Sequence, residues 1–156
     1  MKHFFSFAAL VILAAASCRS NKSFLERSNP DKSLQEAIKK LEKNPGNDDA
    51  LSAIPILYKE ILASHLANIN AARAGAGKNF SQWDNIIGEY EQLQKAYNRI
   101  INSTAAFTLV NPQNFSAELF EAKDSASLHY YNAAITLLKN KNRGELKKAY
   151  NYFEKA

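Results

Sequence analysis

Histidines and closely spaced carboxylates are the side chains of this sequence that could support acid–base or metal chemistry. Beyond the first few residues only two histidines remain, His65 and His129. They stand alone, without the spacing that places two zinc ligands on one face of a helix. Glu118, Glu121 and Asp124 follow one another at intervals of three residues, a spacing typical of a solvated helix face. We therefore expect no catalytic centre, no metal site and no cofactor.

The single cysteine, Cys18, follows a segment with the character of an export signal. Lys2 supplies a positive start, residues 4–16 are almost entirely apolar, and Ala15, Ala16 and Ser17 are small. This apolar stretch is too short to span about 30 Å of hydrocarbon, and it has the length of a signal-peptide core. The sequence therefore predicts a signal peptide over residues 1–17.

A cysteine directly after such a segment resembles the lipobox of bacterial lipoproteins. The resemblance implies that Cys18 becomes the first residue of the mature chain and that its thiol carries lipid, which anchors the protein to a membrane. Ala15 stands where the family most often has leucine, and an ordinary secretory signal cleaved after Ala16 is the alternative. No acidic residue precedes Glu26, as in outer-membrane lipoproteins that face the periplasm. The resemblance thus places the protein in the cell envelope.

The remainder of the chain has the pattern of a helical protein. Only 5 glycines and 4 prolines occur, whereas sandwiches and barrels need many turns. Residues 18–32 are polar and without periodicity, which predicts a flexible tether ahead of a folded domain over 33–156. Within that domain, apolar residues recur at helical spacing and never alternate as in strands. We expect an all-α fold, with helices that start near Ser33, Asp49, Ser81, Ser116 and Glu145. At the first of these, Ser33 and Glu36 have the spacing of a capping box.

Several apolar stretches resemble the tetratricopeptide repeat, in which two antiparallel helices pack through large and small residues at set positions. The first-helix pattern is matched by Leu51, Ile54 and Tyr58, and again by Trp83, Ile86 and Tyr90. The second-helix pattern is matched by Ala149, Phe153 and Ala156, and by the alanines Ala67, Ala71 and Ala74. The resemblance implies antiparallel helical hairpins stacked into a superhelix; a generic helical bundle is the alternative. No glycine or proline marks a turn near residues 62–64, so residues 49–72 form either one helix or two.

The charge and the aromatic content limit the classes of partner that we expect. The formal charge of +5 is mild, and acids are interspersed with bases, so we expect no nucleic-acid partner. Four tyrosines exceed what one core stripe needs and are candidates for a protein-binding groove; they are Tyr130, Tyr131, Tyr150 and Tyr152. We expect a non-enzymatic, lipid-anchored envelope protein that acts as a protein–protein interaction scaffold for an unidentified envelope partner. The alternative is a structural lipoprotein that binds an anionic envelope polymer through the basic helix–helix turn from Lys139 to Lys148.

Overall fold

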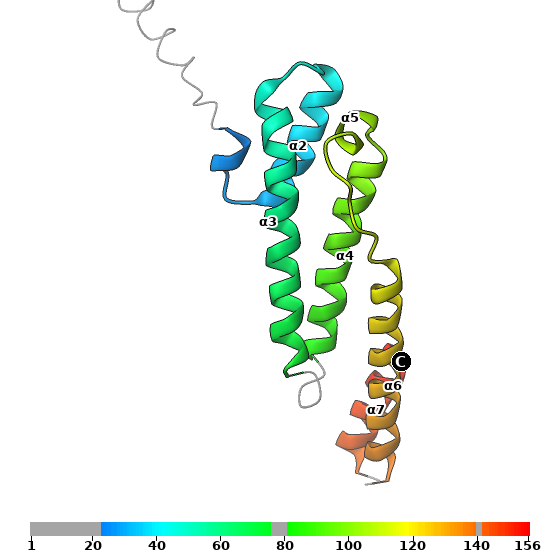
Figure 1. Cartoon of the computed structure of the whole chain (residues 1–156). Helices are drawn as coiled ribbons and strands as arrows, with labels where there is room; N and C mark the ends of the chain where they lie inside the picture. Colours follow the sequence, from blue (N-terminus) through cyan, green and yellow to red (C-terminus); the bar gives the residue numbers. More distant parts are fainter. Residues whose placement is uncertain (1–22, 76–80, 140–141) are drawn as a thin grey trace, which may run out of the picture.

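The computed structural model describes residues 23–75, 81–139 and 142–156. Within these ranges the chain forms helices and no strand (Figure 1), which confirms the predicted all-α fold. The elements are η1 (Phe24–Glu26), α2 (Pro30–Lys43), α3 (Asp48–Arg73), α4 (Ser81–Ile101), α5 (Thr104–Phe107), α6 (Ser116–Leu138) and α7 (Arg143–Lys155).

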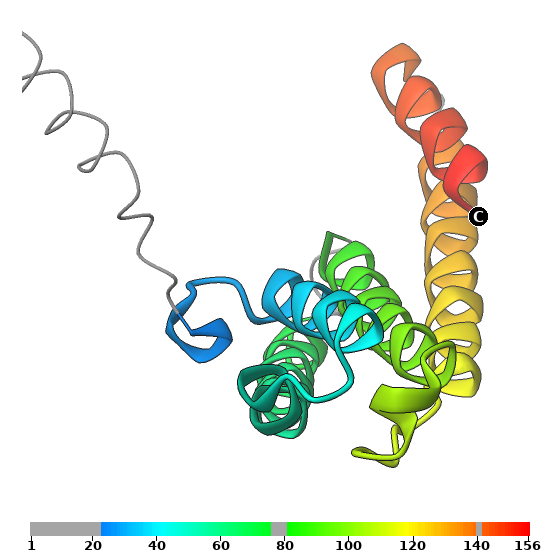
Figure 2. The ribbon, with the colours of Figure 1, turned by 90° about the horizontal axis from the view of Figure 1, so that it is seen from above.

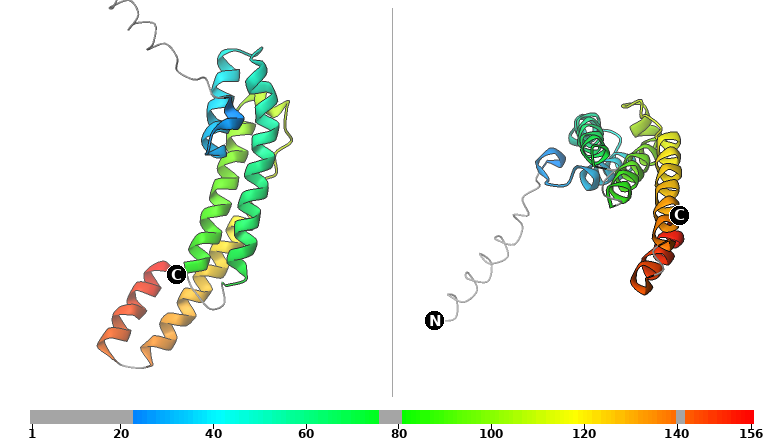
Figure 3. Two further views of the ribbon diagram at one scale, coloured as in Figure 1. Left: turned by 90° about the vertical axis from the view of Figure 1, so that its left-hand side faces the viewer. Right: turned by 90° about the horizontal axis from the view of Figure 1, so that it is seen from below.

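Three of these helices, α2, α3 and α4, lie side by side as an antiparallel bundle (Figures 1 and 2). The single turn α5 follows α4, and α6 then runs back along α4 on the side away from α3. The second half of α6 continues past the ends of α3 and α4, where α7 folds back against it (Figure 3). The fold therefore combines a three-helix body with a projecting α6–α7 hairpin.

The body is held together by apolar side chains from all three helices. Leu34 and Leu41 of α2, Ile61 of α3, and Ile86 and Leu93 of α4 are almost completely inaccessible to solvent. Burial of one such side chain contributes roughly 1.5–3 kcal/mol. The buried face of α6 consists mainly of small residues, which let it approach α4 and α7 closely; its buried residues are Ala122, Ala126, Tyr130 and Ala134.

The folded domain begins earlier than the sequence predicts. α2 starts at Pro30, and the side chain of Asn29 accepts a hydrogen bond of 2.9 Å from the backbone N–H of Lys32. Proline favours the first position of a helix because its fixed φ suits the helix and it has no N–H to leave unpaired. The predicted capping box at Ser33 is therefore wrong, and Ser33 is buried within the helix. Phe24 is also buried, so the tether prediction fails from residue 23 onward.

Residues 49–72 form one helix. α3 runs without a break from Asp48 to Arg73, its start capped by the side chain of Asn47. Ala67, Ala71 and Ala74, which match the small positions of a second repeat helix, are exposed at the end of this helix instead of packing under a partner. This repeat-like match therefore lies within a single helix and forms no hairpin.

The later boundaries agree closely with the sequence. α4 begins at Ser81 and α6 begins at Ser116, as predicted, and α6 ends at Leu138. α7 begins two residues before Glu145, because Asn142 accepts a hydrogen bond of 2.8 Å from the backbone N–H of Gly144 and so caps the helix. Among the described helices, none has the length and apolar character needed to cross a membrane.

Candidate functional site

The four tyrosines proposed as a binding groove all lie on the α6–α7 hairpin, but on two different sides of it. Tyr130 is only 3% exposed, and its ring centroid lies 5.6 Å from that of Tyr152. Tyr131 and Tyr150 are 50% and 63% exposed. The four side chains therefore do not form one groove.

The inner side of the hairpin is attached to the start of α4. The hydroxyl of Tyr130 donates a hydrogen bond of 3.1 Å to Oδ1 of Asp84, and Nζ of Lys155 lies 2.9 Å from Oδ2 of the same carboxylate. Burial raises the pKa of the Tyr130 hydroxyl, and the Asp84 carboxylate raises the pKa of Lys155. The rings of Trp83 and His129 add an aromatic contact, with centroids 5.2 Å apart. These contacts give Tyr130 a structural role.

The outer side of the hairpin is an exposed apolar surface, which we call the outer hairpin surface. Its members come from both helices: Leu128, Tyr131, Ile135 and Leu138 from α6, and Leu146, Tyr150 and Phe153 from α7. The rings of Tyr131 and Phe153 meet edge to face with centroids 5.7 Å apart, which joins the two helices into one surface. A groove of about 470 Å³ lies at this point, and Leu128, Tyr131 and Phe153 line it.

The outer hairpin surface arises because α6 has two apolar faces. Ala122, Ala126, Tyr130 and Ala134 form the buried face at intervals of four residues, whereas the exposed apolar residues of α6 lie on the other side. A helix that is apolar on both faces is normally covered on both faces. Sequence reasoning found Tyr131 and Tyr150 and missed Leu128, Ile135 and Leu146, although their helical spacing relative to Tyr131 and Tyr150 was a usable signal.

Charged side chains of opposite sign lie at the two ends of this surface. Asp124, together with Glu121, is exposed on the first half of α6, and Asp124 lines the groove. Lys139, Arg143 and Lys147 are exposed near the tip of the hairpin. None of the ion pairs among the described residues involves any of these five side chains.

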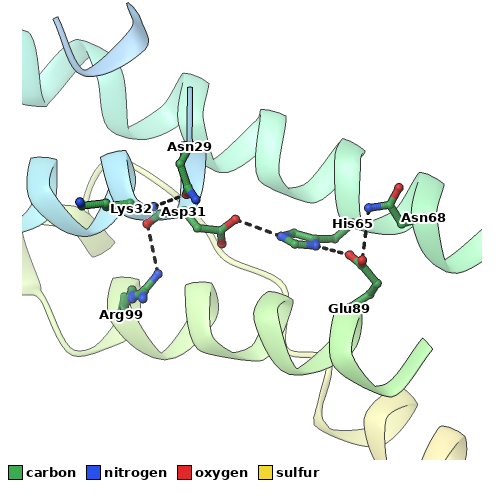
Figure 4. A network of polar contacts seen from close by, with 7 residues as sticks. All are labelled: Asn29, Asp31, Lys32, His65, Asn68, Glu89 and Arg99. Carbon is green, nitrogen blue, oxygen red and sulfur yellow. Dashed lines mark hydrogen bonds and ion pairs between the residues drawn. The ribbon is translucent and has the colours of Figure 1, made fainter. Parts of the chain in front are cut away.

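A second polar cluster, in the body, surrounds His65 (Figure 4). Nε2 of His65 lies 3.2 Å from Oδ2 of Asp31 on α2, and Nδ1 contacts Oε2 of Glu89 on α4. Arg99 of α4 donates to the backbone carbonyl of Asp31 at 3.2 Å, and Asn68 donates to Oε1 of Glu89 at 3.3 Å. The cluster therefore links three helices.

The two carboxylates control the protonation of His65. Hydrogen bonding to Asp31, followed by that to Glu89, raises the pKa of His65 to about 8, although burial acts in the opposite direction. The same contact lowers the pKa of Asp31. When the ring is protonated, both of its nitrogens donate to carboxylates. The cluster therefore has a structural role, because it holds α2, α3 and α4 together. His129, on α6, is not part of this cluster, and its ring contacts Trp83. Within the described residues, no group of three or more side chains could hold a metal ion.

Cys18, the residue predicted to carry lipid, lies outside the described residues, as does the whole of the predicted signal peptide. Comparison with protein-family models, curated proteins and solved structures gives no match for this chain.

Proposed function

We propose that this protein is a non-enzymatic, lipid-anchored module of the bacterial envelope that binds protein through the outer hairpin surface. The observation that carries the proposal is the set of exposed apolar side chains on α6 and α7, which meet where the ring of Tyr131 contacts that of Phe153. Contiguous exposed apolar patches on soluble domains mark interaction sites, because isolated domains gain nothing from presenting them to water.

The composition of this surface suits a protein partner. Aromatic residues are enriched at the centres of protein interfaces, and here Tyr131, Tyr150 and Phe153 lie beside aliphatic side chains. Leucine and isoleucine at helical spacing give α6 the anchors that helices use when they pack on other helices. The lipid anchor on Cys18 belongs to the same proposal through the lipobox-like sequence, and it would confine the surface to the membrane boundary.

The proposal is tested by introducing a photoreactive side chain at Leu128 of the full-length chain in a Gram-negative host. Leu128 is 60% exposed, so the replacement leaves the fold intact, and irradiation should give a covalent product with a protein in the membrane fraction. A photoreactive residue at Lys59, exposed on α3, is the matched control and should give no such product. Equal labelling at the two positions, or no product at Leu128, would refute the proposed binding surface.

A further inference from the structure

We propose that the occupant of the outer hairpin surface is a second copy of this chain, packed antiparallel about a twofold axis near Tyr131. This inference rests on the proposed function, because it names the partner of the same surface. The product would be a four-helix arrangement in which α6 and α7 of one copy cover α6 and α7 of the other.

The distribution of apolar side chains fits self-pairing. A twofold interface brings one patch against itself, so the patch must be complementary to its own rotated image. On α6, Leu128 and Ile135 lie at nearly equal distances on either side of Tyr131. Rotation about an axis there therefore places Leu128 of one copy beside Ile135 of the partner.

The distribution of charge selects the antiparallel orientation. Asp124 and Glu121 flank one end of the surface, whereas Arg143 and Lys147 flank the other. In an antiparallel pair the acidic end of each copy meets the basic tip of its partner, and this happens twice because of the symmetry. A parallel pair would bring like charges together at both ends, which is destabilising.

The shape of the molecule allows the same orientation. The hairpin projects beyond the ends of α3 and α4 (Figure 3). An antiparallel pair therefore places the two three-helix bodies at opposite ends of the new bundle, where they do not collide. With 23 residues, α6 is about 35 Å long, enough for several helical turns of contact.

Cysteine cross-linking of the full chain in detergent tests both the pairing and its direction. A mixture of Leu128→Cys and Ile135→Cys chains should form a disulfide-linked dimer on mild oxidation, to a much greater extent than wild type. Phe120→Cys, which is 72% exposed near the start of α6, should not cross-link to itself, because antiparallel pairing separates the two copies of this position. Self-linking of Phe120→Cys without the mixed product would overturn the proposed orientation.

Charge reversal provides an independent measurement. Asp124→Lys should raise the dimer dissociation constant about tenfold in sedimentation experiments, since each substitution acts twice across the axis. Arg143→Asp combined with Lys147→Asp should do the same, and all three substitutions together should restore most of the affinity. The control Glu60→Lys, exposed on α3, should leave the constant unchanged. A triple variant weaker than either parent would overturn the charge pairing.

The mass of the photoproduct at Leu128 separates this inference from the proposed function. A product of twice the chain mass, which is lost when the photoreactive chain also carries Ile135→Lys, supports self-pairing. A product with a different protein, from a chain that sediments as a monomer, overturns self-pairing and leaves the proposed function standing. A monomer without any photoproduct overturns both.

Discussion

His65 on α3 lies with its Nε2 atom 3.2 Å from Oδ2 of Asp31 at the start of α2. The two residues are 34 positions apart in sequence, and Glu89 of α4 occupies the other ring nitrogen. A protonated imidazole in this position can donate to both carboxylates at once, so its charge contributes directly to the packing of three helices.

This contact predicts a pH-dependent stability. The pKa of His65 rises from 6.5 to about 8 on folding, so its contribution is fully present below about pH 6.5 and is lost as the pH rises through about 8. The contribution is at most about 2 kcal/mol, because the carboxylates remain partly solvated. The denaturant midpoint should therefore decrease as the pH is raised from about 6 to about 8.5.

Two histidine variants provide the check on this interpretation. His65→Gln should remove most of the fall in denaturant midpoint between the two pH values. His129→Gln, at an exposed residue of α6 whose ring contacts Trp83 and neither carboxylate of the cluster, should retain it. An undiminished fall in His65→Gln would assign the pH dependence to other groups.

Tyr130 and Tyr150 should respond differently to removal of the hydroxyl group. Tyr130→Phe deletes the donor to Asp84 and should lower the free energy of unfolding by about 1 kcal/mol. Tyr150→Phe removes a hydroxyl from a ring that is 63% exposed and should leave the stability unchanged. Thermal or denaturant unfolding monitored by circular dichroism measures both, and equal effects would argue against the anchoring role of Tyr130.

Ala149 and Lys148 are neighbours with opposite environments. Ala149 is fully buried between α7 and α6, whereas Lys148 is exposed. Ala149→Leu should overpack this contact and destabilise the protein by about 1–3 kcal/mol. Lys148→Leu should change the free energy of unfolding by no more than about 0.5 kcal/mol. Denaturant midpoints of the two variants measure both effects. An Ala149→Leu variant as stable as wild type would contradict the prediction.

The proposed lipid anchor depends on one atom, the sulfur of Cys18. Cys18→Ser should abolish incorporation of labelled fatty acid and release the protein from the membrane fraction, because no other thiol is available in the chain. Lys32→Ala, at an exposed position outside the lipobox-like segment, is the control and should leave labelling intact. Membrane retention of Cys18→Ser after a high-salt wash would contradict the lipoprotein assignment.

Local sequence signals located the longer helices but misplaced the start of α2, and the start of α7 by two residues. The boundaries of α4 and α6 could be read from periodicity and from the polar residues at Ser81 and Ser116. The start of α2 could not be chosen correctly, because two local signals competed: Ser33 with Glu36, and Asn29 with Pro30. Burial of Ser33 against the rest of the bundle decided between them, and burial is a property of the assembled helices.

The outer hairpin surface also depends partly on local sequence and partly on tertiary packing. The sequence by itself determined the helical period and hence the two apolar faces of α6, because residues three and four apart necessarily share a side of a helix. It also determined the opposite charges at Asp124 and Arg143. Only the tertiary structure decided which apolar face is covered, since α4 and α7 pack on the side of Ala126 and Tyr130 and leave Leu128 and Ile135 in solvent. The contacts between Tyr130 and Asp84 and between His65 and Asp31 likewise depend on long-range packing, which no local spacing encodes.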